Sequence, residues 1–129
     1  MIYADTSAVV KLLRTDEPDA DTVRRFVAEA GDLVSSRLLA IELHAVASRL
    51  HIESRIINRL LDRIHQVSID EDVVQKAIEV NSGLRSLDAI HLATIVVLGE
   101  DVDELLCFDR RLCDAAVGLG IPIVDPRRV

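Results

Sequence analysis

Two aspartates directly follow short apolar runs with the character of β-strands. Asp5 ends the run MIYAD, and Asp109 ends the run LLCFD. Because ligands of open parallel sheets bind beyond the carboxyl ends of the strands, we expect both side chains to enter one crevice if the strands are near neighbours. The alternative for each aspartate is a structural role, in which it caps the next helix through the first backbone amides.

Two further carboxylates interrupt apolar helical faces. Glu42 shares a face with Leu39 and Val46 in RLLAIELHAVASRL, and Asp88 lies on the apolar face of LRSLDAIHLATIVVL. An ionised carboxylate on a buried stripe is costly without a partner. A buried arginine could pair with Glu42, and a helix N-terminus capped by Ser86 could account for Asp88.

Together the four carboxylates would offer only oxygen ligands. Crowded in a half-buried crevice, they would raise one another's pKa values unless a cation lay among them. The sequence has no cluster of Cys or His, so the expected cation is Mg²⁺, or Mn²⁺, rather than zinc. His91, nearly one turn after Asp88, could be a further ligand, but we expect it to orient a carboxylate or to complete the helix packing. Mg²⁺ leaves positions for phosphate oxygens, and the pattern therefore favours phosphodiester hydrolysis by a metal-activated water.

The elements that must position these side chains alternate between short apolar strands and amphipathic helices. In the first half we expect a strand over 1–5, a helix capped by Thr6 or Ser7 and ending near Leu13, a helix in DADTVRRFVAEAG, a strand in LVSS, and helices over 37–51 and 54–65. In the second half we expect a short strand in VSI, a helix in DEDVVQKAIEVNSG, a helix over 86–98, a loop in GEDVDE, a strand in LLCFD, a helix in RRLCDAAVGLG and a strand in IPIV.

This alternation predicts the fold class. Strands that are apolar along their whole length are typical of a parallel sheet covered on both faces. We therefore expect a three-layer α/β fold, with a central, mostly parallel β-sheet flanked by helices, as one domain over residues 1–129. A chain of this length buries enough surface for a packed core without disulfides.

Composition narrows the classes of function. The formal net charge of −7 excludes broad, charge-driven binding to nucleic acid but leaves room for a local rim of arginines. Cys107 and Cys113 are too few for a disulfide framework and are expected to be reduced residues of the core. No segment resembles a signal peptide or reaches the length of a membrane span, so the expected location is cytoplasmic.

The motifs together resemble a known family. MIYADTSAVVKLL, a glutamate within the third helix, LRSLDAIHLATIVVL and LLCFDRRLCDAA are similar, over essentially the whole chain, to the PIN domain, and specifically to the VapC-like ribonuclease toxins of toxin–antitoxin modules. Among these motifs, SLDAIHLAT is the most specific and DTSAVVKLL is the next.

The resemblance implies a site and an activity. It implies a metal-binding, catalytic quartet of Asp5, Glu42, Asp88 and Asp109, supported by the hydroxyls of Thr6 and Ser7. It further implies a Mg²⁺- or Mn²⁺-dependent endoribonuclease that cuts RNA, tRNA in many relatives, and that is a homodimer inhibited by a cognate VapB-like antitoxin. Such antitoxins often bring an arginine toward the acidic site, which is compatible with the negative charge of this chain.

The segment around Asp109 departs from the family pattern, and nearby arginines add a prediction about RNA binding. Cys107 stands where many relatives carry Thr or Ser, and no further acid follows Asp109 closely, so Asp109 is the least secure of the four ligands. By their proximity to the acidic motifs, five arginines are predicted to bind RNA phosphates: Arg14, Arg37, Arg85, Arg110 and Arg111.

Two other function classes compete with the nuclease. A PIN-like module without catalytic activity that binds RNA or protein would not need Glu42 and Asp88 in apolar surroundings. A phosphoryl-accepting receiver or an aspartyl phosphatase is disfavoured, because Ser7 occupies the place where the phosphatase pattern requires a second aspartate.

Overall fold

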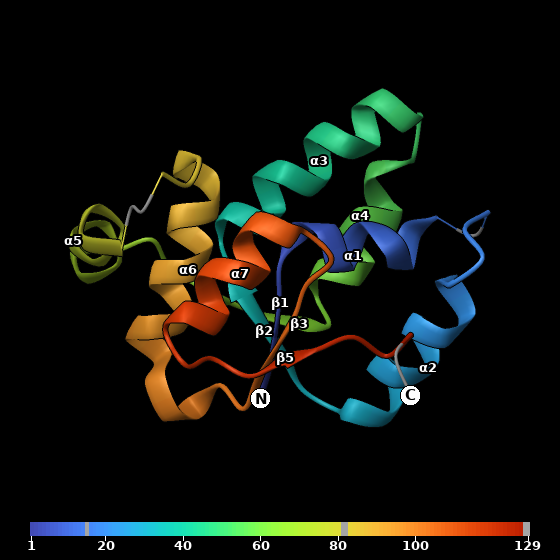
Figure 1. Cartoon of the computed structure of the whole chain (residues 1–129). Helices are drawn as coiled ribbons and strands as arrows, with labels where there is room; N and C mark the ends of the chain where they lie inside the picture. The colour runs from blue at the N-terminus through green and yellow to red at the C-terminus, as the bar shows by residue number, and fades with distance from the viewer. Residues whose placement is uncertain (15, 81–82, 128–129) are drawn as a thin grey trace.

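The computed structural model describes residues 1–14, 16–80 and 83–127. The strands are β1 (Ile2–Ala4), β2 (Leu33–Ser36), β3 (Ile64–Val67), β4 (Glu104–Leu106) and β5 (Ile123–Val124). The helices are α1 (Thr6–Leu13), α2 (Ala20–Ala30), α3 (Leu38–Leu50), α4 (Ser54–Leu61), α5 (Glu71–Val80), α6 (Ser86–Leu98) and α7 (Arg110–Gly118), with a 3₁₀ turn η1 (Gly99–Asp101) inside the predicted acidic loop. Figure 1 shows their arrangement along the chain.

The strands form one sheet in the order β3-β2-β1-β4-β5, and every pairing is parallel. β1 is central, with Tyr3 level with Val34 of β2 on one side and with Leu105 of β4 on the other. Because β1 and β4 are parallel neighbours, the segments that follow them leave the sheet side by side at the carboxyl ends of the strands. This neighbourhood is the condition on which a shared crevice for Asp5 and Asp109 depended.

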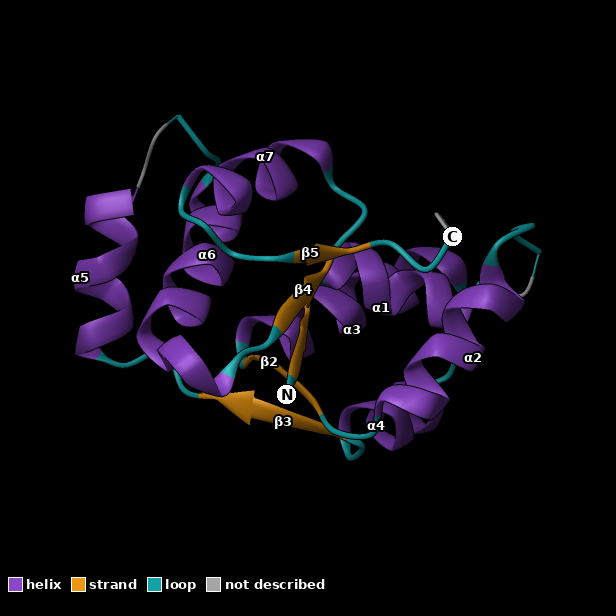
Figure 2. Cartoon of the chain, turned by 60° about the horizontal axis from the view of Figure 1, so that its bottom comes forward, coloured by secondary structure: helices purple, strands orange, loops and turns teal. Residues whose placement is uncertain are grey.

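Helices cover both faces of the sheet, as Figure 2 shows. On one face, residues such as Ala4 and Leu106 pack in a core with side chains from α1, α3 and α4, and partly buried residues of α2 join it. On the other face, Tyr3 and Leu105 pack against α6 and α7, and α5 lies against α6. The alternation of these neighbours along the strands produces the three layers, and the predicted α/β fold class is confirmed.

Several predicted boundaries were wrong, each for a reason of pairing. The strand expected in VSI lies earlier, over β3, because Ile64 aligns with Leu33 of β2 and is buried there, and α4 consequently ends at Leu61 rather than at 65. The strand expected in LLCFD ends at Leu106, since its partner β1 ends at Ala4. The strand expected in IPIV is shorter and spans Ile123–Val124. The helix expected in DEDVVQKAIEVNSG spans Glu71–Val80. Residues 81–82, which the prediction included, lie outside the described residues.

None of the helices among the described residues is long and apolar enough to cross a lipid bilayer.

Candidate active site

Asp5 follows β1 and begins α1. Its side chain is 3% exposed, and Oδ1 accepts a hydrogen bond from the backbone amide of Ala8 at 3.1 Å. It is thus the cap of α1, and the prediction that Thr6 or Ser7 supplies this cap was wrong, because both residues already lie within the helix. Capping and a place in the crevice are compatible, since only part of the carboxylate is used by the helix.

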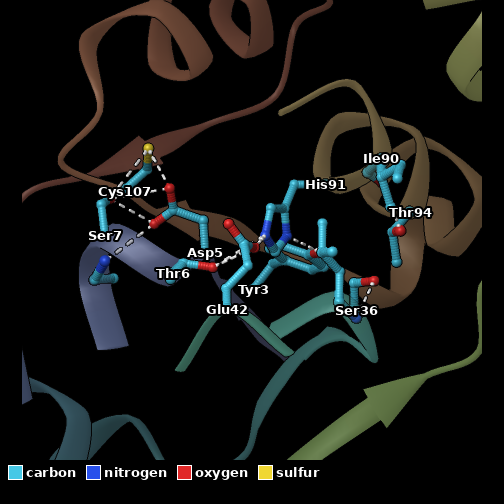
Figure 3. Close-up of polar contacts among 12 residues, drawn as sticks. Tyr3, Asp5, Thr6, Ser7, Ser36, Glu42, Ile90, His91, Thr94 and Cys107 are labelled. Atoms are coloured by element: carbon cyan, nitrogen blue, oxygen red, sulfur yellow. Dashed lines mark hydrogen bonds and ion pairs between the residues drawn. The ribbon is translucent and has the colours of Figure 1, made fainter. Parts of the chain in front are cut away.

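Two small side chains hold the rest of the Asp5 carboxylate. The hydroxyl of Ser7 lies 2.7 Å from Oδ1 and 3.0 Å from Oδ2, and the thiol of Cys107 lies 3.3 Å from Oδ2 (Figure 3). The Ser7 hydroxyl also accepts the backbone amide of Phe108 at 3.0 Å, which joins the start of α1 to the segment after β4. Burial nevertheless outweighs these donors and raises the pKa of Asp5.

Glu42 projects from α3 toward the start of α1 and toward α6. Its Oε1 accepts the Thr6 hydroxyl at 2.6 Å and His91 Nε2 at 2.9 Å. Burial acts to raise the pKa of Glu42, but the hydrogen bonds from His91 and Thr6 and the nearby imidazole outweigh it and lower this pKa. The partners of this carboxylate are therefore a hydroxyl and an imidazole, and the buried arginine considered from the sequence was wrong.

The ring nitrogen of His91 that does not contact Glu42 contacts Tyr3. The residue is 2% exposed, and its Nδ1 lies 2.7 Å from the hydroxyl of Tyr3, which is fully buried in β1. The two rings meet edge to face. The prediction that His91 orients a carboxylate agrees with this geometry, whereas Tyr3 was missed because a tyrosine in an apolar strand carries no sequence signal beyond core packing.

Asp88 lies in the first turn of α6 and is half-buried. Burial raises its pKa, and the negative charges of Asp109 and Glu42 raise it further, against the opposing influence of His91 and Arg85. The side chain of Asp88 makes no hydrogen bond to any residue that the structure describes. The predicted cap at Ser86 was wrong, since the helix is preceded by Arg85, whose side chain makes no capping hydrogen bond.

Asp109 begins α7 as Asp5 begins α1. Its Oδ1 accepts the backbone amides of Arg111 at 2.9 Å and Leu112 at 3.4 Å, so it caps this helix. The negative charge of Asp109 contributes to the raised pKa of Asp88, so the two carboxylates lie within electrostatic reach of each other. The four predicted acids thus lie around the carboxyl ends of the strands. Asp5 follows β1, Glu42 lies in α3, Asp88 lies in α6 and Asp109 precedes α7.

The acids do not form a closed cage. Among residues 1–14, 16–80 and 83–127, no group of three or more His, Cys, Asp or Glu side chains lies in an arrangement that could hold a metal ion directly. Asp5, Glu42 and Asp109 instead turn toward hydroxyl, imidazole and backbone donors.

The five predicted phosphate-binding arginines fall into two groups. Arg37, Arg85, Arg110 and Arg111 are exposed and lie at the starts of α3, α6 and α7, close to the acids. Arg14 lies at the opposite end of α1 from Asp5 and forms ion pairs with Asp16 and Glu17. Three pockets of the structure are lined by residues other than the four acids and these arginines, one of them by segments of α2, β2 and α4.

Comparison with known proteins gives this arrangement a context. The model of the PIN domain family matches residues 2–118. The chain belongs to the PIN domain family. The curated protein Ribonuclease VapC46 of Mycobacterium tuberculosis is 36% identical over 97% of this PIN domain chain and 97% of its own length. Ribonuclease VapC35 of the same species is 34% identical over 98% of this chain and 97% of its own length.

Solved structures share the fold of this PIN domain at low identity. A toxin–antitoxin complex from Klebsiella pneumoniae contains a chain with a TM-score of 0.75 and 20% identity, covering 100% of both chains. Mycobacterium tuberculosis VapC20, a Sarcin-Ricin loop cleaving toxin, has a TM-score of 0.73 and 17% identity, covering 89% of this chain and 95% of its own. The family and the fold that the sequence resemblance implied are therefore confirmed.

Proposed function

We propose that this PIN domain is an endoribonuclease toxin that hydrolyses RNA phosphodiester bonds with the help of a divalent cation. The observation that carries the proposal is the gathering of Asp5, Glu42, Asp88 and Asp109 at the carboxyl edge of the sheet, where the charges of Asp109 and Glu42 raise the pKa of Asp88. The ribonuclease names of the relatives at 36% and 34% identity support the reaction and the polymer.

The donor chemistry of the site fits a hard cation. Carboxylate oxygens are the ligands that such a cation prefers, and the side chain of Asp88 makes no competing hydrogen bond to a described residue. Because no three of the described acids are arranged to hold a metal ion directly, the carboxylates would have to move closer together to bind it. Asp5, Glu42 and Asp88 would hold Mg²⁺, with Mn²⁺ as the alternative, and Asp109 would bind directly or through water. When bound, such a cation neutralises the crowded carboxylates, polarises a phosphate and activates water for attack.

The protein's own residues prepare this chemistry. Ser7 and Cys107 fix the carboxylate of Asp5, and Thr6 and His91 fix that of Glu42. The exposed arginines at the starts of the helices around the acids, Arg37, Arg85, Arg110 and Arg111, would bind RNA phosphates. Because the chain carries a net charge of −7, these local contacts rather than the whole surface must attract the polymer.

The same comparisons support an antitoxin as partner. Two related folds were solved as toxin–antitoxin assemblies, from Klebsiella pneumoniae and Rickettsia felis, the second bound to promoter DNA. A VapB-like antitoxin that inserts a cationic side chain among the acids would neutralise them as a metal does and would block RNA. We further propose a homodimer and a tRNA or another structured RNA as substrate.

The test is cleavage of a mixed tRNA and ribosomal RNA preparation by the purified protein, with Mg²⁺, with Mn²⁺ and with chelator. We expect metal-dependent cleavage that Asp88→Asn and Asp109→Asn reduce by at least about 100-fold. The matched control is Asp114→Asn, which removes an exposed acid of α7 outside the site and should leave the rate unchanged. Absence of metal-dependent cleavage in the wild type would overturn the proposal in favour of a binding module, and full cleavage by Asp88→Asn would show that these acids are not the catalytic site.

A further inference from the structure

A chain of hydrogen bonds runs from the interior of the sheet to one carboxylate of the site. Tyr3 in β1 contacts His91 Nδ1 at 2.7 Å, and His91 Nε2 contacts Glu42 Oε1 at 2.9 Å. Figure 3 shows the imidazole between the phenol and the carboxylate. Tyr3 is fully buried and His91 is 2% exposed, so solvent cannot take the place of either contact.

The chemistry of the end groups fixes the direction of the chain. An ionised carboxylate only accepts hydrogen bonds, so the proton on this side of the ring belongs to Nε2. On a neutral imidazole Nδ1 is then an acceptor, and the Tyr3 hydroxyl donates to it.

The hydroxyl of Thr6 completes the arrangement at Glu42. It donates to the same Oε1 at 2.6 Å, so both hydrogen bonds to the carboxylate are made by one oxygen. Oε2 makes no hydrogen bond to a residue that the structure describes. The rotation of the carboxylate is thereby fixed with Oε2 directed away from its donors.

We propose that Tyr3 and His91 form a positioning pair that locks Glu42 with Oε2 available to the cation. The pair rests on the proposed function, because it matters only if Glu42 is a metal ligand. Neither residue is proposed to touch RNA or metal: the Tyr3 hydroxyl, by donating to Nδ1, favours the same Nε2–H tautomer of His91 that Glu42 requires, and His91 with Thr6 sets the orientation of Glu42. Groups that orient metal ligands in this way typically change metal affinity about 10- to 100-fold when they are removed.

The first test measures the tautomer of His91 in the protein without metal. Long-range ¹⁵N NMR of the metal-free protein should show His91 as the Nε2–H tautomer in the wild type and a mixture of tautomers in Tyr3→Phe. A wild-type ring that carries its proton on Nδ1 alone, or a tautomer unchanged in Tyr3→Phe, would contradict the pair. This readout remains informative if the protein proves not to be a nuclease.

The second test measures the affinity for Mn²⁺ by calorimetric titration. We expect His91→Ala to weaken Mn²⁺ binding about 10- to 100-fold and Tyr3→Phe by a smaller factor. His91→Gln, whose amide can donate to Glu42, should restore most of the affinity, and Tyr3→Phe should have no further effect in its presence. The matched control is Ile95→Val, a buried change on the same helix outside the chain of hydrogen bonds, which should bind Mn²⁺ as the wild type does.

The outcomes separate the two proposals. If the wild type binds no Mn²⁺, the metal site itself and the proposed role of the pair both fail, whatever the tautomer. If the wild type binds Mn²⁺, and Tyr3→Phe and His91→Ala, both folded with thermal unfolding close to that of Ile95→Val, bind it as tightly as the wild type, the site stands and the positioning pair is refuted.

Discussion

The thiol of Cys107 lies 3.3 Å from Oδ2 of Asp5. A thiol is a weak hydrogen-bond donor, so Asp5 is buried with less support on this side than a serine or threonine would give. A hydrogen bond with Cys113 and burial both raise the pKa of the Cys107 thiol, so it stays protonated beside the carboxylate. The contact is one reason why burial dominates at Asp5.

Removing this donor should make Asp5 harder to ionise. The thiol acts to lower the pKa of Asp5, so Cys107→Ala should raise it and move the acidic limb of the pH–rate profile toward higher pH, by less than about one unit for so weak a donor. The control is Cys113→Ala, whose thiol donates to the Cys107 carbonyl and not to Asp5. Acidic limbs that coincide for the two variants would show that the thiol does not act on Asp5.

Asp5→Asn should abolish cleavage while stabilising the metal-free protein. A carboxyl whose pKa is raised on folding contributes to stability below its unfolded pKa, and this contribution is lost as the pH rises through the folded value. At neutral pH, which lies above the unfolded pKa, the raised pKa of the buried Asp5 therefore opposes folding. Asparagine keeps an oxygen for Ser7 and Ala8 without the charge, and we expect a gain on the order of 1 kcal/mol in urea unfolding at pH 7. The gain should disappear below about pH 4, where the wild type is protonated as well.

Glu42→Gln should have the opposite effect on stability. The pKa of Glu42 is lowered on folding, so its ionised form stabilises the protein above the unfolded pKa, and this stabilisation is lost as the pH falls through the folded value. Glutamine keeps an acceptor for Thr6 and His91 but weakens both hydrogen bonds, and we expect a loss of roughly 1 kcal/mol at pH 7. Urea unfolding of both variants at one pH gives a direct comparison: a gain for Glu42→Gln, or a loss for Asp5→Asn, would contradict the described environments.

Sequence reasoning could predict the layers and the acids because both depend on local patterns. The apolar strands required a covered parallel sheet, and the carboxyl ends of β1 and β4 were where Asp5 and Asp109 were expected. That residues 1–129 form one domain, and that the four acids bind metal, stay predictions.

The partners of the acids could not be predicted in the same way. The contacts of Glu42 with Thr6 and His91 join α3 to α1 and α6, and the contact of Asp5 with Cys107 joins residues about a hundred positions apart. Such pairs are set by the packing of helices across the sheet, which no spacing in one sequence encodes. Strand ends shifted for a similar reason, because a strand stops where its neighbour stops, as β4 does beside β1.

The arginines around the acids provide a test of how an acidic protein binds RNA. Arg37 directly precedes α3, at the carboxyl ends of the strands, and among the described residues its side chain forms a hydrogen bond with Gln66 alone, at 3.3 Å. Arg14 instead lies at the far end of α1 and forms ion pairs with Asp16 and Glu17. We expect Arg37→Ala to weaken binding of RNA to the Asp88→Asn protein and to reduce the slope of log K against log salt by about one, because one phosphate contact is lost. Arg14→Ala changes the net charge equally and is the matched control, so equal losses in the two variants would show that overall charge, and not a phosphate contact at Arg37, sets the affinity. Filter binding at several salt concentrations with a labelled single-stranded RNA measures both.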